Sequence, residues 1–224
     1  MATQLDLQEQ EQLDALKAFW NKQGNLVTWT LVLALGGFAA FNGWQYWQRD
    51  QGVKASAMFD ELDRAAQAGD VQKTALVFGD LKDRFGRTAF AQQGALLAAR
   101  VQFDKGQVDA AKASLSWAAE HGDDEIRAIA RLRLAALQAD AKQYDEAIKT
   151  LAAANALGFE ALVEDRRGDV LMAQGKKPEA LAAYQAAYKA MGEKVDYRRL
   201  VEAKLTALGA PPAPPAAAAS GAAP

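Results

Sequence analysis

Residues 105–111 read KGQVDAA, and the same kind of turn followed by alanine recurs as AKQYDEA at 141–147 and QGKKPEA at 174–180. The alanines that close these stretches are separated by 36 and 33 residues: Ala111, Ala147 and Ala180. Between the stretches, apolar residues recur three and four positions apart, without the alternation of a β-strand. The sequence therefore predicts helices joined by short turns, in a repeat of about 34 residues.

Residue size follows the same repeat. Small residues lie twelve positions before each closing alanine (Ala99, Ala135, Gly168) and seven positions after it (Ala118, Ala154, Ala187). Four positions after it lies a larger residue: Leu115, Leu151 or Tyr184. Antiparallel helices approach closely only where both carry small side chains, and the larger residue then fills the gap to the next hairpin. This is the tetratricopeptide pattern. A weaker copy, AGDVQKTA at 68–75, places Ala75 a further 36 residues upstream.

The end of the repeat region predicts a capping helix. Apolar residues share one face of this helix, and Gly209 follows it: Leu200, Val201, Leu205 and Leu208. Such a helix would cover the last open apolar surface of a solenoid. The following GAPPAPPAAAASGAAP, residues 209–224, predicts a disordered or polyproline-like tail, and a ligand for a proline-reading domain is an alternative.

Upstream of the repeats, the chain carries no charge from Gln23 to Gln48. As a helix these residues would extend about 39 Å, whereas a bilayer core is about 30 Å thick. Within the most apolar part, LVTWTLVLALGGFAAF at 26–41, the hydroxyls of Thr28 and Thr30 can bond to the helix's own carbonyls. Three aromatic residues at the end are typical of a membrane interface: Trp44, Tyr46 and Trp47. We expect a transmembrane helix over 23–48.

Two alternatives exist for this stretch. A buried core helix of a soluble domain can also lack a polar face. A cleaved signal peptide fits less well, because the first 22 residues are acidic on balance and no clear cleavage site follows.

Composition excludes several function classes. From Arg49 to Leu208 the positive and negative charges balance, and the net charge of −2 comes from the first 22 residues, so nothing favours nucleic acid as a partner. The chain has no cysteine and one histidine, His121, which excludes thiolate sites and a His-based relay or cluster. No nucleophile–base pair or phosphate loop stands out. We expect no enzyme activity, cofactor or metal.

Two sets of residues are candidates for a site. In tetratricopeptide solenoids the first helix of each pair lines the concave face, and repeat offsets place six polar or large residues there as partner-binding candidates: Gln93, Arg100, Phe103, Asp165, Asp169 and Met172. The alternative is that the apolar residues of this face only form core. Arg167, next to the small Gly168, is expected inside a helix crossing with Glu164 as its ion-pair partner, and a binding role is the other interpretation.

Three features together resemble the YfgM family: DALKAFWNKQGN at 14–25, the span ending GWQYWQ at 43–48, and EDRRGDVLMAQGKKPEA at 164–180. The resemblance covers residues from about 10 to 208. Its most specific parts are the Trp-x-Tyr-Trp end of the span and the Asp165-x-Arg167-Gly168-Asp169 motif.

The resemblance implies an all-α protein, in which one transmembrane helix precedes a tetratricopeptide-like solenoid of three to four hairpins and a capping helix. It implies an acidic cytoplasmic segment (1–22), an inner-membrane helix (23–48) and a periplasmic repeat domain (49–208); the tail (209–224) is outside the shared pattern. The implied partners are membrane lipid, the SecYEG translocon, a PpiD-like periplasmic chaperone and exported unfolded chains.

The implied function is an adaptor that links the translocon to periplasmic chaperones. A membrane-anchored scaffold for a signalling or envelope-assembly complex is the alternative. The orientation rests on the resemblance alone, because Lys17 and Lys22 on one side of the span balance Arg49 and Lys54 on the other.

Overall fold

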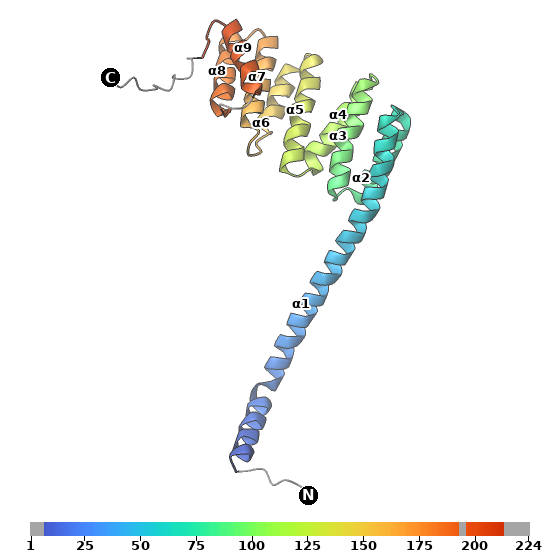
Figure 1. The fold of residues 1–224 in the computed structure, drawn as a ribbon, viewed down its shortest axis with the longest axis vertical. Coiled ribbons are helices and arrows are strands. Elements are labelled where there is room, and N and C mark those ends of the chain that lie inside the picture. The colour runs from blue at the N-terminus through green and yellow to red at the C-terminus, as the bar shows by residue number, and fades with distance from the viewer. Residues whose placement is uncertain (1–6, 193–195, 213–224) are drawn as a thin grey trace, which may run out of the picture. The chain divides into compact units, whose positions relative to one another are not determined.

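The computed structural model describes residues 7–192 and 196–212, and all regular secondary structure within these ranges is helical (Figure 1). The predicted all-α class is confirmed. The described chain forms two units, residues 1–53 and 54–224, and each is treated by itself below. Residues 1–6 of the expected N-terminal segment and 213–224 of the expected tail lie outside the described residues.

The first unit consists of the larger part of helix α1 (Leu7–Gln67). Thr28 Oγ1 donates to the carbonyl of Gly24 at 2.7 Å, and Thr30 Oγ1 donates to the carbonyl of Leu26 at 2.9 Å. The hydroxyls within the apolar stretch are therefore satisfied by the helix itself, as expected from the sequence.

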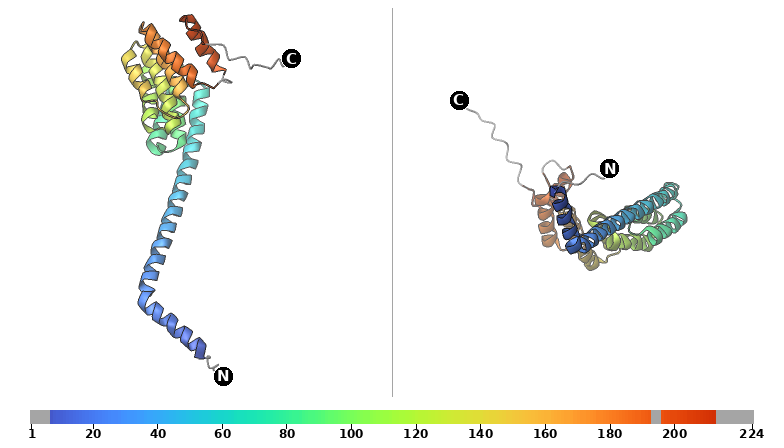
Figure 2. Two further views of the ribbon diagram at one scale, coloured as in Figure 1. Left: turned by 90° about the vertical axis from the view of Figure 1, so that its left-hand side faces the viewer. Right: turned by 90° about the horizontal axis from the view of Figure 1, so that it is seen from below.

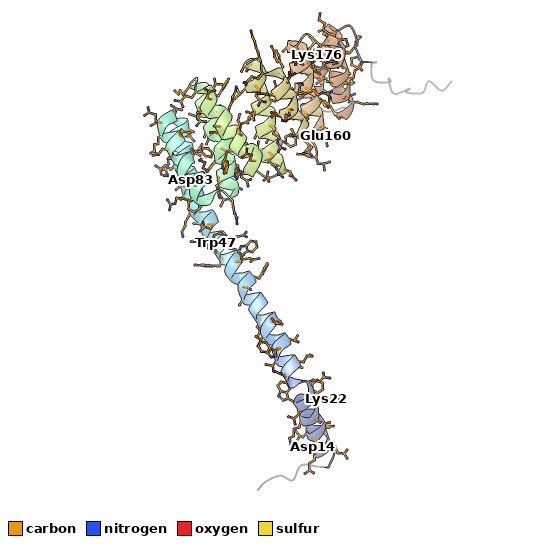
Figure 3. All side chains as sticks on the ribbon, turned by 180° about the vertical axis from the view of Figure 1, so that it is seen from behind. Asp14, Lys22, Trp47, Asp83, Glu160 and Lys176 are labelled. Atoms are coloured by element: carbon orange, nitrogen blue, oxygen red, sulfur yellow. The ribbon has the colours of Figure 1, made fainter. Side chains whose placement is uncertain are left out.

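The apolar side chains of this unit point outward. Figure 3 shows the ring of Trp47 projecting away from the helix. Among the described residues, one helix is long and apolar enough to cross a membrane; its most apolar window has a mean hydropathy of 1.5, and only 6% of that window is buried. A core helix would be mostly buried, so this exposure favours a membrane span over the alternative of a core helix.

The second unit is a series of helical hairpins. The end of α1 pairs with α2 (Val71–Phe85), and three further pairs follow: α3 (Ala89–Asp104) with α4 (Val108–His121), α5 (Asp124–Asp140) with α6 (Tyr144–Ala152), and α7 (Glu160–Ala173) with α8 (Lys177–Ala190). A last helix, α9 (Tyr197–Ala207), follows α8. Val201 and Leu205 of α9 are buried against the last hairpin, which confirms the predicted cap, while Leu200 stays exposed.

The turns within the four hairpins share one geometry. Each contains a residue with positive φ: Gly69, Gly106, Lys142 and Gly175. At each turn this residue donates its N–H three positions back and the next residue donates five positions back, as Gly106 does to Phe103 and Gln107 to Gln102, both at 2.8 Å. This is a helix end of the Schellman type, which favours glycine because the left-handed region penalises a Cβ atom.

In the first hairpin, the buried position lies one residue earlier than the sequence pattern predicted. Five positions after the turn residue lies a fully buried side chain in every hairpin: Thr74, Ala111, Ala147 and Ala180. Ala75, which the sequence pattern placed in this set, is exposed. The prediction is wrong by one residue because the first repeat is 37 residues long, from Gly69 to Gly106.

The first hairpin also has a different packing. Leu62 and Leu81 occupy the positions where the later hairpins carry alanine or glycine, and both are fully buried. Gly94 of α3 provides the missing space, because a Cβ atom there would lie 2.9 Å from Leu81 Cδ2 and 3.0 Å from Leu62 Cδ2. In the first hairpin, the small residue that allows close packing is therefore Gly94 on the following helix, α3.

Candidate functional site

A groove runs between α3 and α5, the first helices of two successive hairpins. It has a volume of about 410 Å³, and its lining is largely apolar: Ala99, Arg100 and Phe103 from α3, Leu115 from α4, and Arg133, Ala136, Leu137 and Asp140 from α5. The side chain of Phe103 is 47% exposed, although α3 packs against both α2 and α4. We refer to this surface as the α3–α5 groove.

Charged side chains border the groove in a fixed order along the helices. Arg100 faces Asp104 one turn later on α3, with 3.9 Å between Nε and Oδ2, and both side chains are well exposed. On α5, Arg133 precedes Asp140 by about two turns, and neither makes an ion pair within the described part of the chain. Asp104 and Asp140 lie at equivalent repeat positions, so the carboxylates gather at the carboxyl ends of both helices.

Two of the six sequence-predicted binding residues, Arg100 and Phe103, line this groove. Gln93 lies on the exposed side of α3, two turns earlier, and does not line it. Met172 is half-buried against the apolar cluster of α8 and α9. The remaining two, Asp165 and Asp169, have a different environment.

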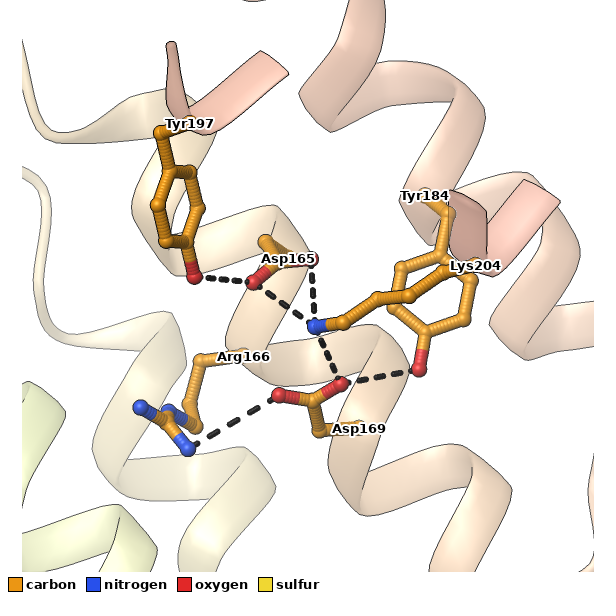
Figure 4. A network of polar contacts seen from close by, with 6 residues as sticks. All are labelled: Asp165, Arg166, Asp169, Tyr184, Tyr197 and Lys204. Atoms are coloured by element: carbon orange, nitrogen blue, oxygen red, sulfur yellow. Dashed lines mark hydrogen bonds and ion pairs between the residues drawn. The ribbon is translucent and has the colours of Figure 1, made fainter. Parts of the chain in front are cut away.

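Asp165 is buried beneath α9, with 1% of its surface exposed. Lys204 Nζ contacts both of its carboxylate oxygens, at 2.8 and 3.0 Å, and Tyr197 Oη donates to Oδ2 at 2.7 Å (Figure 4). Both partners belong to α9. The expectation that Asp165 lies on an open binding surface is wrong, because the capping helix covers this part of α7.

Asp169, one turn further along α7, shares the same lysine. Lys204 Nζ lies 2.6 Å from Asp169 Oδ1, and Tyr184 Oη of α8 donates to the same oxygen at 2.9 Å. Arg166 approaches the other oxygen at 3.7 Å. We call these groups the α7–α9 polar cluster: Asp165, Arg166, Asp169, Tyr184, Tyr197 and Lys204 (Figure 4).

The environment of the cluster stabilises the protonated tyrosines. Burial, followed by the hydrogen bond to Asp165, raises the pKa of Tyr197 to about 12. Burial and the hydrogen bond to Asp169 also raise the pKa of Tyr184. Both phenols therefore act as hydrogen-bond donors at any physiological pH, and the cluster holds α7, α8 and α9 together.

Gly168 explains the glycine in the Asp-x-Arg-Gly-Asp motif. The ring of Tyr184 crosses directly over it, so that a Cβ atom on residue 168 would lie 2.4 Å from Cε1 and 2.6 Å from Cδ1. The motif therefore combines a seat for an aromatic ring with two carboxylates that bond to the ring's hydroxyl and to α9. Its geometry assigns it a structural role.

Arg167 lies at the surface, not inside a helix crossing. Its Nη1 contacts both carboxylate oxygens of Glu164, at 3.1 and 3.2 Å, so the partner is the expected one. About half of the Arg167 side chain, 47%, is exposed, and solvent screens such a pair. The expected internal location is wrong, because the side chain is exposed and pairs with Glu164 one turn earlier on the same helix.

No group of three or more His, Cys, Asp or Glu side chains in the described ranges is arranged to hold a metal ion. The described residues form an apolar groove and a structural polar cluster. Comparison with known proteins identifies the family in which they occur. The sequence model of the family described as a tetratricopeptide repeat-like domain matches residues 17–210.

Several similar proteins carry one name, ancillary SecYEG translocon subunit. The protein from Neisseria gonorrhoeae is 29% identical over 204 residues, which are 90% of this chain and 98% of that protein. The protein from Escherichia coli K12 is 30% identical over 188 residues, 81% of this chain and 87% of that protein. The protein from Haemophilus influenzae is 29% identical over 182 residues, 81% and 89% respectively.

The chain belongs to the YfgM family of tetratricopeptide-like proteins. The similarity extends along almost the full length of these relatives, so it includes both the apolar helix and the repeats. Membership of the YfgM family, together with an exposed apolar helix near the N-terminus, supports a membrane anchor.

Proposed function

We propose that this chain is a membrane-anchored adaptor of the Sec translocon, whose repeat domain binds a segment of a chaperone or of an emerging chain. The observation that carries the proposal is the similarity to ancillary SecYEG translocon subunits over 90% of the chain. An anchor fixes the repeats near the membrane, and a tetratricopeptide-like fold presents helical grooves to peptides. The two parts together suit recruitment better than catalysis.

The α3–α5 groove is the proposed contact surface. Its apolar floor can take a bulky apolar side chain, and the exposed ring of Phe103 would lose its contact with water on binding. Arg133 and Asp140 have no ion-pair partners within the described residues, so they are free to pair with opposite charges on the bound segment. Such rim charges favour specificity over raw affinity.

The proposed topology places residues 1–22 in the cytoplasm, residues 23–48 in the inner membrane and residues 49–208 in the periplasm. Its support is the family resemblance, since the charges beside the span are balanced. A C-terminal alkaline phosphatase fusion should be active in intact cells, because this enzyme folds only after export. A C-terminal green fluorescent protein fusion should be dark. The reverse pattern would place the repeats in the cytoplasm and contradict the chaperone link.

A photo-crosslinking side chain at Phe103, in the full-length chain in its own membrane, should capture a chaperone or a translocating chain. The probe would stand at the mouth of the α3–α5 groove. Capture should fall when Arg100→Glu is added, while helix content stays the same, since an exposed charge change costs less than about 0.5 kcal/mol of stability. Mass spectrometry of the crosslinked products would identify the captured protein.

The matched control is the same probe at Lys149, an exposed position on α6 that does not line the groove. Equal capture from both positions would mean that the groove is not the contact surface. Co-purification of the full-length chain with translocon subunits tests the translocon association separately. Capture of a signalling or envelope-assembly protein at Phe103, with no co-purifying translocon subunits, would instead favour a scaffold unrelated to secretion.

A further inference from the structure

The first turns of α1, before the membrane span, have an exposed apolar face. Four large apolar side chains are exposed there: Leu13, Leu16, Phe19 and Trp20. At about 100° per residue, these four fall within an arc of about 120° around the helix. None of the described residues of the first unit covers them.

The opposite side of the same turns is polar. Glu11, Asp14 and Lys22 lie on or near that side, and Lys17 flanks the apolar arc, where it contacts Asp14 at 3.4 Å. From Gln10 to Lys22 the two negative charges equal the two positive ones. A helix of this kind can lie with its apolar side in the membrane interface and its polar side in water, held by buried apolar area.

The junction with the span is built to bend. Figure 2 shows α1 changing direction within its darkest blue part, before the long straight section. Gly24 is buried under the indole of Trp20, since a Cβ atom there would lie 3.2 Å from three atoms of that ring. The carbonyl of Gly24 also accepts the hydroxyl of Thr28 at 2.7 Å, and such a bond from a threonine back to the fourth residue before it often bends a helix.

We propose that residues 10–22 lie along the membrane surface as an interfacial helix, with Leu13 and Leu16 in the outer acyl region. The occupant of the apolar face is the lipid bilayer, because the face continues without a linker into the span that the bilayer already surrounds. The bend at Gly24 turns the first turns away from the axis of the span. Trp20 then lies at headgroup depth, where its ring is half in an apolar environment. This proposal does not depend on what the repeat domain binds.

The chain has no cysteine, so single-cysteine variants of the full-length protein carry one label each. The test uses Leu16→Cys and Ala18→Cys. Positions 16 and 18 are two apart in the sequence and lie on opposite sides of the helix, and both native side chains, Leu16 and Ala18, are exposed. Each variant is labelled with an environment-sensitive fluorophore and reconstituted into phosphatidylcholine–phosphatidylglycerol vesicles. We expect a blue-shifted emission and loss of fluorescence to a lipid-borne quencher at position 16, but water-like emission at position 18. Phe38→Cys in the span provides the reference for full insertion.

Three outcomes would overturn the proposal. Water-like emission at both 16 and 18 would mean that the helix stands clear of the membrane. Lipid quenching at both positions would mean that it continues the span. Shielding at position 16 that disappears when the protein is diluted in excess lipid would assign the apolar face to a second copy of the chain.

Discussion

Replacing Lys204 by methionine should lower the free energy of unfolding of the repeat domain by about 3 kcal/mol. The lysine is the cation shared by Asp165 and Asp169, and without it the buried carboxylate of Asp165 keeps only its bond from Tyr197. A buried charge left without its partner is strongly destabilising, whereas the methionine keeps most of the volume of the side chain. Urea unfolding of the full-length protein in detergent, followed by circular dichroism, measures the change.

Two further variants make this expectation specific. Arg167→Ala removes a surface ion pair on the same helix and should cost less than about 1 kcal/mol. Asp165→Asn combined with Lys204→Met should cost less than the sum of the single changes, because the double variant no longer buries an unpaired charge. If Lys204→Met were as mild as Arg167→Ala, the α7–α9 polar cluster would not be what holds α9 in place.

Gly168→Ala should be as damaging as the loss of Lys204, although it adds only a methyl group. The new Cβ atom would lie 2.4 Å from Cε1 of Tyr184, and this ring is fixed at its other end by the hydrogen bond to Asp169. Overpacking of a close contact typically costs about 1–3 kcal/mol, and a ring that cannot move aside favours the upper end of that range. Thermal unfolding monitored by circular dichroism reports the loss as a lower melting temperature.

Gly79 provides the matched control for this change. It lies inside α2, where a Cβ atom would meet nothing within 4 Å. Gly79→Ala should therefore raise stability by about 0.5–1 kcal/mol, because alanine loses less conformational freedom in a helix than glycine does. If Gly168→Ala were stabilising, as Gly79→Ala is expected to be, the ring of Tyr184 would not rest on residue 168.

The long apolar helix and most of the hairpins could be predicted because their signals are local. An uncharged stretch between Gln23 and Gln48 indicates a long apolar helix, and a turn followed by alanine five positions later indicates a hairpin. The phase error at Ala75 has a local cause as well: the first repeat has one extra residue and carries Thr74 at the buried position. The positive φ of Gly69, which marks the true phase, is a property of the folded backbone.

The candidate site was harder to predict because it depends on contacts between distant parts of the chain. Repeat offsets place Asp165 and Asp169 on a helix face, but they do not say whether a later helix covers that face. The partners of these aspartates, Tyr197 and Lys204, lie 32 to 39 residues further along. One signal was available in the sequence. Two carboxylates lie one turn apart on α7, and α9 carries a tyrosine and a lysine two turns apart that can bond to them. Repeat offsets did place Arg100 and Phe103 on one helix face, and none of the described helices covers the α3–α5 groove that they line.

The position of the α7–α9 polar cluster affects how the domain folds during synthesis and where it can be truncated. Lys204 lies 39 residues after Asp165, so the carboxylate of Asp165 has no cationic partner until α9 has been synthesised. A chain truncated before Lys204 keeps that unfinished surface permanently, even though every hairpin is present. Shortened versions should therefore extend at least through Gly209, where α9 ends in a turn of positive φ, and tags belong after that turn.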